Sequence, residues 1–310
     1  MEPQGSAVPK QPKATAPVVL VIGTTGLIGR HLVDEFAREP GGVHVRFAAR
    51  RPEQVERLRA EGRDAVLLDL DDPRTFAQAL VGVERLFLLT GYTVAMFVQS
   101  KTLVDAARKA RVRHIVHLGV FGNWDCTAPH FAGHQLVERY IEASGIAWTH
   151  LHPNVFMELL PTIMPIRNGT FPIFWGEQRV GWIAARDIAA VAATVLRDGP
   201  EEHGGQDYWL SAEVASGPEI ATILTRVLGY PIHCEIKQPH EFKATMSATG
   251  DYPVESWYAE ATLEGLRQIH DGRMGYIGTV RDDVPFVTGR ASTSLRRWAE
   301  ENRERLIRQA

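Results

Sequence analysis

The stretch APVVLVIGTTGLIGRHLVDEFA, residues 16–37, decides the fold. Its first part, residues 18–22, is an unbroken run of β-branched and apolar residues, which predicts a strand buried on both faces. In residues 27–38 the apolar side chains recur at helical spacing, which predicts a helix. Between strand and helix lies GTTGLIG, with Gly23, Gly26 and Gly29 at intervals of three.

Each glycine of this turn has a separate physical role. Gly23 allows the chain to turn sharply off the strand, and Gly26 allows the backbone to approach a pyrophosphate with no Cβ in the way. Gly29 allows the helix to pack tightly on the strand. Because the glycines follow a strand and open a helix whose N–H groups can bind phosphate, we interpret the stretch as a dinucleotide-binding turn rather than a plain glycine-rich turn.

Outward from this unit, strands alternate with helices over about 150 residues. That alternation predicts an α/β fold with right-handed crossovers and a doubly wound parallel Rossmann sheet. The remaining expected strands are 43–48, 65–70, 86–90, 114–120 and 147–152, and the remaining helices are 52–61, 73–80, 94–110 and 131–144.

After Pro153 the pattern is broken by prolines and glycines. A helix over 187–196 capped by Asp187, a strand at 208–211 and a helix over 216–228 with Ser216 as N-cap and Gly229 beyond its end are predicted. A strand at 232–236 and helices near 254–270 and 291–308 complete a smaller C-terminal α+β lobe over the carboxyl edge of the sheet. The expected division is a disordered leader, 1–16, a Rossmann domain, 17–155, and a smaller lobe, 156–310, interleaved with it.

Composition limits the classes of partner. The chain has 310 residues, a formal net charge of -3 and no block of Lys and Arg, so nucleic acid and anionic membranes are not favoured. The two cysteines, Cys126 and Cys234, suit a reducing cytoplasm. The sequence contains no run of 18 apolar residues, so it predicts no membrane-spanning helix. We expect a cytoplasmic protein with a small hydrophobic substrate; a homodimer is left open.

The end of the second strand bears on the choice of cofactor. NAD-selective enzymes place Asp or Glu near this point to accept from the ribose 2′-OH, whereas this chain has Arg50 and Arg51. A guanidinium binds a 2′-phosphate bidentately, so NADP(H) is favoured over NAD, with Arg30 as a second candidate partner. The residues expected at the cofactor are Gly23, Thr24, Thr25, Gly26, Leu27, Ile28, Gly29, Arg30, Arg50, Arg51, Asp69, Leu70, Thr90, Gly91, Pro153 and Asn154.

An ordered set of motifs resembles the NmrA-like family of atypical short-chain dehydrogenases/reductases. The motifs are GTTGLIG, AARRP, LLDLDD, HIVHLGV, HFAGHQLVERYIEASGIAWTHLHPNVFMELL and GWIAARDIAAVAATVL, and the likeness covers about residues 17–230. The resemblance implies a Rossmann domain, NAD(P) binding and a small C-terminal lobe. The family contains both reductases and catalytically silent redox sensors, so the resemblance alone does not imply an enzyme.

The chain departs from this class of protein at the proton donor. No tyrosine is followed by Lys four residues later, and Gly119 stands where ordinary short-chain dehydrogenases have Ser. Isoflavone-reductase-like relatives use the lysine of an F-x-x-K motif for this role, and His134 occupies the position of that lysine here. A histidine can supply a proton near neutral pH, so the predicted catalytic residue is His134, with His130 and Tyr92 as alternatives.

Two further interpretations concern the substrate and a metal. The aromatic and apolar residues expected to line a substrate site are Phe121, Trp124, Phe156, Met157 and Trp182. His130, His134 and Glu138 share one helix face, which also resembles a set of metal ligands, but the cofactor signature supplies a chemistry without a metal. We therefore predict an NADPH-dependent reductase of a small hydrophobic carbonyl, imine, quinone or activated alkene; the alternative is a non-catalytic NADP(H) sensor that acts through a protein partner.

Overall fold

The computed structural model describes residues 16–244 and 255–307. A seven-stranded sheet lies at its centre, in the order β10-β6-β5-β4-β1-β2-β3, and every neighbouring pair is parallel. The predicted doubly wound Rossmann sheet is therefore confirmed. The strands are β1 (Val18–Val21), β2 (His44–Ala49), β3 (Ala65–Leu67), β4 (Val83–Leu88), β5 (His114–Leu118), β6 (Ala147–Pro153) and β10 (Gln206–Leu210).

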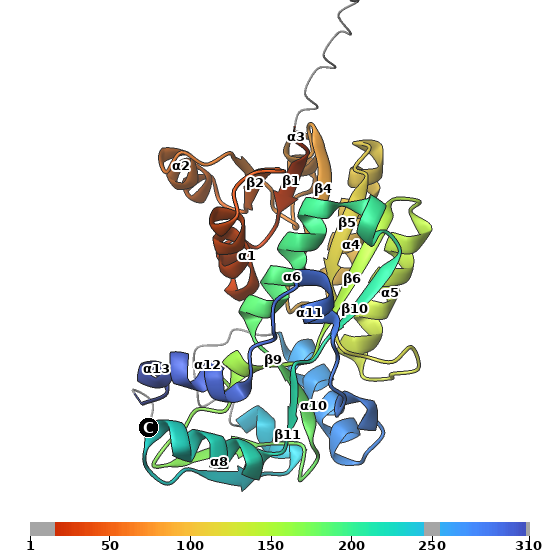
Figure 1. The fold of residues 1–310 in the computed structure, drawn as a ribbon. Helices are drawn as coiled ribbons and strands as arrows, with labels where there is room; N and C mark the ends of the chain where they lie inside the picture. Colours follow the sequence, from red (N-terminus) through yellow and green to blue (C-terminus); the bar gives the residue numbers. More distant parts are fainter. Residues whose placement is uncertain (1–15, 245–254, 308–310) are drawn as a thin grey trace, which may run out of the picture.

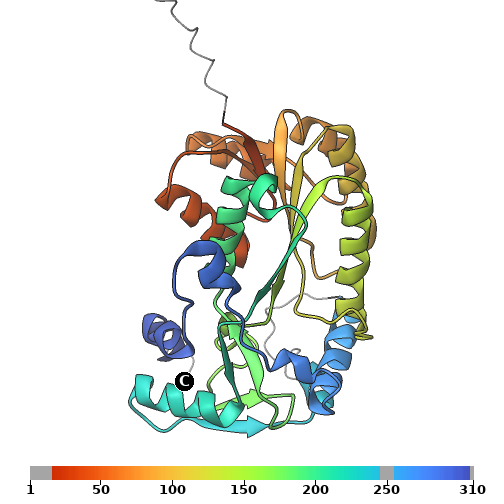
Figure 2. The same cartoon turned by 45° about the vertical axis from the view of Figure 1, so that its right-hand side comes forward.

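Helices cover both faces of the sheet (Figures 1 and 2). On one face, α1 (Leu27–Arg38) and α6 (Ala185–Asp198) pack on Val19 and Val21 of β1. On the other, α3 (Phe76–Ala79), α4 (Met96–Lys109) and α5 (Pro129–Ala143) share a core with Leu20. Alternate residues of β1 thus enter two different cores, which explains its unbroken apolar sequence. The helix α2 (Pro52–Ala60) packs beside β2 and β3.

A second group of elements lies beyond the carboxyl ends of these strands (Figure 1). It contains a three-stranded sheet, β11-β9-β7, and a two-stranded sheet, β12-β8. Its strands are β7 (Val155–Phe156), β8 (Thr170–Ile173), β9 (Val180–Ile183), β11 (Glu213–Ala215) and β12 (His233–Ile236). The later helices are α7 (Pro200–His203), α8 (Gly217–Leu228), α10 (Ser256–His270), α11 (Asp283–Thr288), α12 (Leu295–Glu301) and α13 (Arg303–Ile307). Short 3-10 turns are η1 (Pro73–Thr75), η2 (Met157–Leu159), η3 (Pro239–Glu241) and η4 (Gly275–Ile277).

In the second half of the chain, a predicted helix cap is confirmed where the two interacting residues are close in sequence. The predicted cap of α8 is confirmed: Ser216 and Glu219 form a capping box, and Gly229 is left-handed at the C-cap. The predicted cap of α6 is wrong. Its N-cap is Ala184, and the Asp187 carboxylate instead accepts hydrogen bonds from the Thr293 backbone and hydroxyl, at 2.7 and 2.8 Å.

Other differences concern where elements pair and end. The strand expected at 208–211 joins the main sheet as β10, beside β6, rather than the smaller lobe. The helix expected near 291–308 is divided at Asn302 into α12 and α13. The predicted leader lies outside the described residues except for Ala16, and the expected helix ends at residues 254 and 308 also lie outside them. Within the described part of the chain, no helix has the length and apolar character needed to cross a bilayer.

Candidate active site at the carboxyl edge of the sheet

The turn between β1 and α1 has the close geometry that its glycines permit. Gly23 has φ +75°, and the Gly26 N–H donates to its carbonyl at 2.9 Å. A Cβ on Gly29 would lie 2.0 Å from the Gly23 oxygen, which is backbone and cannot rotate away. At Gly26, which is extended and exposed, a Cβ would meet only that same oxygen, at 3.2 Å. Gly23 and Gly29 are thus required by the turn, whereas Gly26 leaves its outer surface open.

The first turn of α1 offers unpaired donors at this surface. For the amides of Leu27, Ile28 and Gly29 we find no acceptor among residues 16–244 and 255–307, whereas the Arg30 N–H donates to the Gly26 carbonyl at 3.1 Å. The first turn contains no acidic side chain. Free amides and an uncompensated helix N-terminus form a site suited to phosphate.

Two arginines near this turn have no carboxylate partner among residues 16–244 and 255–307. Thr24 is buried, and its hydroxyl donates to the Ala48 carbonyl at 3.4 Å, which ties the turn to the end of β2. Arg50 directly follows β2 and is exposed, as is Arg30 on α1. In the described part of the chain neither lies within 4.0 Å of a carboxylate oxygen, whereas Arg51 is 3.9 Å from Glu53. The charges of Arg30 and Arg50 are therefore available to an anionic ligand.

The other predicted cofactor residues differ in how open they are. Thr25 and Gly91 are exposed, and Leu27, Asp69, Leu70 and Thr90 are half-buried. Asn154 is buried, and its amide donates to the Ser211 hydroxyl and the Ile277 carbonyl at 3.2 and 2.9 Å. Its oxygen accepts from the Val155 N–H at 2.9 Å. Asn154 therefore fastens the end of β6, at Pro153, to the second lobe.

The predicted substrate residues are not gathered on one surface. Phe121, Met157 and Trp182 are buried in the core of the second lobe, and the Trp182 indole donates to the Ala215 carbonyl at 3.4 Å. Phe156 is half-buried, while Trp124 is 83% exposed. In this structure only the last two present appreciable surface.

The three candidate proton donors do lie together, joined by a residue that the sequence did not indicate. The Tyr92 ring centroid is 4.6 Å from that of Tyr258 on α10, and the His130 ring centroid is 4.9 Å from that of Tyr258. The His134 ring is 4.9 Å from that of His130. Tyr92 is 46% exposed and His134 only 4%, so the group runs from the surface to the interior.

Burial changes the acid–base character of the two histidines. It lowers the pKa of His130 to about 4 and that of His134 well below its ordinary value. His134 Nδ1 lies 3.4 Å from Nε2 of His117 on β5, which is also buried. At neutral pH His134 is therefore a neutral imidazole that faces a second neutral imidazole.

The sequence placed Glu138 on the helix face of His134, but it did not indicate the polar cluster that these two residues join. Residues of β5, β6 and α5 bring further ionisable groups together: His117, Glu138, His150, His152 and, from β10, Asp207. The available signal was the presence of histidines within otherwise apolar strands that are buried on both faces. In the described residues, no group of three or more His, Cys, Asp or Glu side chains is arranged to hold a metal ion.

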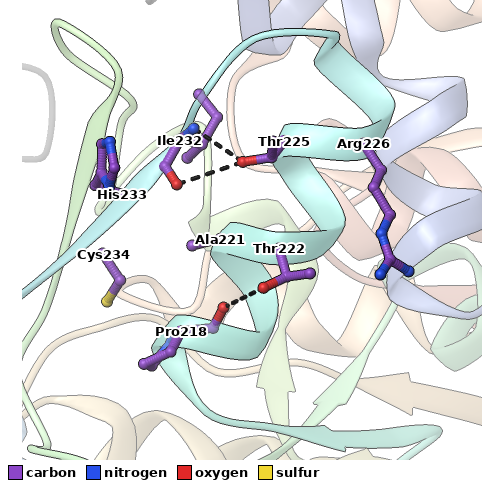
Figure 3. Close-up of a pocket in the computed structure, with 8 residues that line it drawn as sticks. All are labelled: Pro218, Ala221, Thr222, Thr225, Arg226, Ile232, His233 and Cys234. Atoms are coloured by element: carbon purple, nitrogen blue, oxygen red, sulfur yellow. Dashed lines mark hydrogen bonds between the residues drawn. The ribbon is translucent and has the colours of Figure 1, made fainter.

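Two open hollows lie away from this edge. One, of about 450 Å³, lies between α8 and β12, where Thr225 pairs with the backbone of Ile232 (Figure 3). The other, of about 600 Å³, lies between α3 and the later turns of α4, toward the end of that helix farthest from the carboxyl edge. Because neither hollow lies at the carboxyl edge, we identify the candidate site from the glycine turn, its free N–H donors and the ionisable groups nearby.

Comparison with known proteins agrees with this architecture. The model of the NmrA-like family matches residues 15–267. An NAD(P)H azoreductase of Xenophilus azovorans is 32% identical over 91% of this chain and 97% of its own. Quinone oxidoreductase 2 of Escherichia coli is 24% identical over 75% of this chain and 82% of its own. The triphenylmethane reductase of Citrobacter sp., crystallised with NADP(H), has a TM-score of 0.77 at 22% identity and covers 95% of this chain and 100% of its own. The chain thus belongs to the NmrA-like family.

Proposed function

We propose that this protein is an NADPH-dependent reductase of small hydrophobic electrophiles, with its site at the carboxyl edge between β1 and β4. The observation that carries the proposal is the glycine turn, whose free amides and neighbouring unpaired arginines suit a phosphorylated dinucleotide. The relatives named as an NAD(P)H azoreductase and a quinone oxidoreductase support the same class of reaction.

The amides of Leu27, Ile28 and Gly29 would hold the pyrophosphate, and Arg50 or Arg30 the 2′-phosphate. When bound, NADPH supplies the hydride. The substrate class is a carbonyl, imine, quinone or activated alkene, and the azoreductase likeness adds azo compounds.

We further propose that His134 delivers the proton that the reduced acceptor takes up. Its Nδ1 is engaged by His117, which leaves Nε2 for the acceptor or an intervening water. Because burial keeps His134 neutral, it can release a proton from one nitrogen efficiently only if another arrives at the second nitrogen. His130 and Tyr92 remain the alternative donors.

One observation favours a second function, a non-catalytic NADP(H) sensor. Burial lowers the pKa of His134, so it is not a charged proton donor at neutral pH, and the sequence lacks the Tyr-x-x-x-Lys motif that would supply one instead. A sensor would bind the dinucleotide and change its contacts with a protein partner without turnover.

One experiment distinguishes the reductase from the sensor. Binding of NADPH and NADH is measured by titration calorimetry, and NADPH oxidation is then followed with quinones, imines, enones and aromatic azo compounds. The reductase requires tighter binding of NADPH than NADH and oxidation by at least one acceptor class. Tight binding with no oxidation by any class supports the sensor instead.

A further inference from the structure

The space between α5 and strands β5 and β6 contains an unusual group of buried ionisable side chains. Four imidazoles, His117, His134, His150 and His152, are each 4% exposed or less, and Glu138 is 7% exposed. Such groups are stable inside a protein only when they share protons or hydrogen bonds. The cofactor site uses only His134, so the others need a separate explanation.

At the outer end of the group, His152 carries a proton on both nitrogens. Its Nε2 lies 2.8 Å from the Asp207 carboxylate and its Nδ1 3.0 Å from the Val120 carbonyl. Because both partners only accept, both nitrogens must donate, and the ring is an imidazolium. Burial alone would lower the pKa of His152, but the Asp207 hydrogen bond and the charge of Glu138 outweigh it and raise that pKa. The Asp207 side chain is 46% exposed and reaches solvent.

In the middle, one carboxyl group stands between two imidazoles. Glu138 Oε1 is 3.6 Å from His152 Nδ1 and 4.0 Å from His117 Nδ1. The latter nitrogen is buried and has no hydrogen-bond partner among the described residues. A shift of the carboxyl by about 1 Å would form a hydrogen bond with it. Burial raises the pKa of Glu138 to about 7, so its protonated and ionised forms are both populated at neutral pH.

Gly119 makes room for that carboxyl. A Cβ at this position would lie 2.6 Å from Glu138 Oε1. Any other residue at the end of β5, including the serine of ordinary short-chain dehydrogenases, would push the carboxyl away from its place between the imidazoles. The absence of that serine and the presence of Glu138 are thus two aspects of one arrangement.

At the inner end of the group, the His117 ring lies against the His134 ring. Nε2 of His117 and Nδ1 of His134 are 3.4 Å apart. Burial lowers the pKa of both rings well below the ordinary value, so neither holds a charge for long. A neutral imidazole conducts by accepting a proton on one nitrogen while releasing another from the opposite one.

We propose that these side chains form a proton relay between solvent and the reaction site, in the order Asp207, His152, Glu138, His117 and His134. The relay rests on the proposed function, since it supplies the proton that accompanies the hydride. For each acceptor reduced, His134 gives one proton to the product, each member takes one from its outer neighbour, and water at Asp207 restores the first. No side chain is oxidised or reduced.

Other charges face the relay. Glu138 is near Arg139 and Glu142 of its own helix and near Asp207 and His152 across the gap. His150 lies beside His117, with ring centroids 5.4 Å apart, and its Nε2 is 3.7 Å from Glu142. Neither His150 nitrogen has a hydrogen-bond partner among the described residues, so His150 and Glu142 lie off the path.

The test compares three full-length variants. Glu138→Gln keeps the shape but cannot carry a proton, and Gly119→Ala displaces the carboxyl while leaving it ionisable. Glu142→Gln, on the same helix and outside the path, is the matched control. The two readouts are histidine ¹⁵N NMR of the unloaded protein over pH 5–9, and NADPH-driven turnover of a carbonyl or imine in water and in deuterium oxide.

The relay predicts that His152 is doubly protonated at pH 7. Its ¹⁵N signals should also report the titration of the neighbouring Glu138 near pH 7, which Glu138→Gln abolishes and Glu142→Gln retains. It also predicts that Glu138→Gln and Gly119→Ala each lower kcat by about tenfold or more, with the NADPH Kd within twofold of wild type. A neutral His152 at pH 7, or Glu138→Gln turnover within twofold of wild type with an unchanged solvent isotope effect, would overturn it. If the wild type oxidises no NADPH, the reductase proposal fails by itself, and the NMR titration still decides whether His152 and Glu138 exchange a proton.

Discussion

Replacing Gly26 by valine should separate cofactor binding from folding. Gly26 has an extended backbone, φ -77° and ψ 179°, that valine adopts readily. Its Cβ would meet only the Gly23 oxygen, at 3.2 Å, so that neighbour must yield by a few tenths of an ångström. We expect the free energy of unfolding to change by less than about 1 kcal/mol, since Gly26 is exposed.

The effect on NADPH should be much larger. The branched side chain would stand over the amides of Leu27 and Ile28, where the pyrophosphate is proposed to bind. Each hydrogen bond to a charged group contributes about 1.5–3 kcal/mol, so losing two weakens binding by about 3–6 kcal/mol, more than 100-fold. Titration calorimetry measures the loss, and urea unfolding measures the stability.

Gly29→Ala is the matched comparison. Its Cβ would lie 2.0 Å from the Gly23 oxygen and 2.8 Å from the Thr24 Cα, both backbone atoms. It should therefore destabilise the fold by about 1–3 kcal/mol, as overpacking does. NADPH affinity of Gly26→Val within threefold of wild type would refute the assignment of the glycine turn to the pyrophosphate.

The remaining predictions concern cofactor choice, the donor and acid stability. Arg50→Leu should weaken NADPH binding by about 1.5–3 kcal/mol in calorimetry and leave NADH binding unchanged; equal effects on both would exclude a 2′-phosphate contact. His134→Phe should keep NADPH affinity and lower single-turnover reduction of an imine by about 10²-fold, and a rate within threefold of wild type would make His134 structural. Burial lowers the pKa of His114 and His130 to about 4, so each prefers its neutral form when folded, and stability present above pH 6.5 is lost as pH falls. At pH 5 each should reduce the free energy of unfolding by about 2 kcal/mol in urea titrations, and a pH-independent midpoint would contradict this.

The features that could be predicted from the sequence are those whose interacting residues are close together along the chain. The β1–α1 unit and the capping box of α8 were predictable because Gly23, Gly29, Ser216 and Glu219 interact within a few residues. The misassigned Asp187 shows the opposite case: its partner, Thr293, is 106 residues away, and no local pattern indicates it. The placement of β10 beside β6 is another long-range choice that the strand pattern does not specify.

The same limit applies to the site. The sequence brought His130, His134 and Glu138 to one helix face, but it could not show that this face turns inward against His117 and His152. Burial, not residue type, sets the protonation of these groups, and burial depends on the packing of three strands and a helix. Tyr258 was missed for the same reason, because it comes from α10, far along the chain.

We propose that this protein moves a hydride from NADPH to an organic acceptor at the carboxyl edge of its sheet. The most direct measurement mixes the preformed complex of protein and 4-deuterated NADPH with an imine or enone under single-turnover conditions. We expect the absorbance of the reduced nicotinamide to disappear in step with product formation, and mass spectrometry to find deuterium on the carbon of the product. Tight NADPH binding with no loss of that absorbance, or a product without deuterium from either 4-position, would contradict the claim.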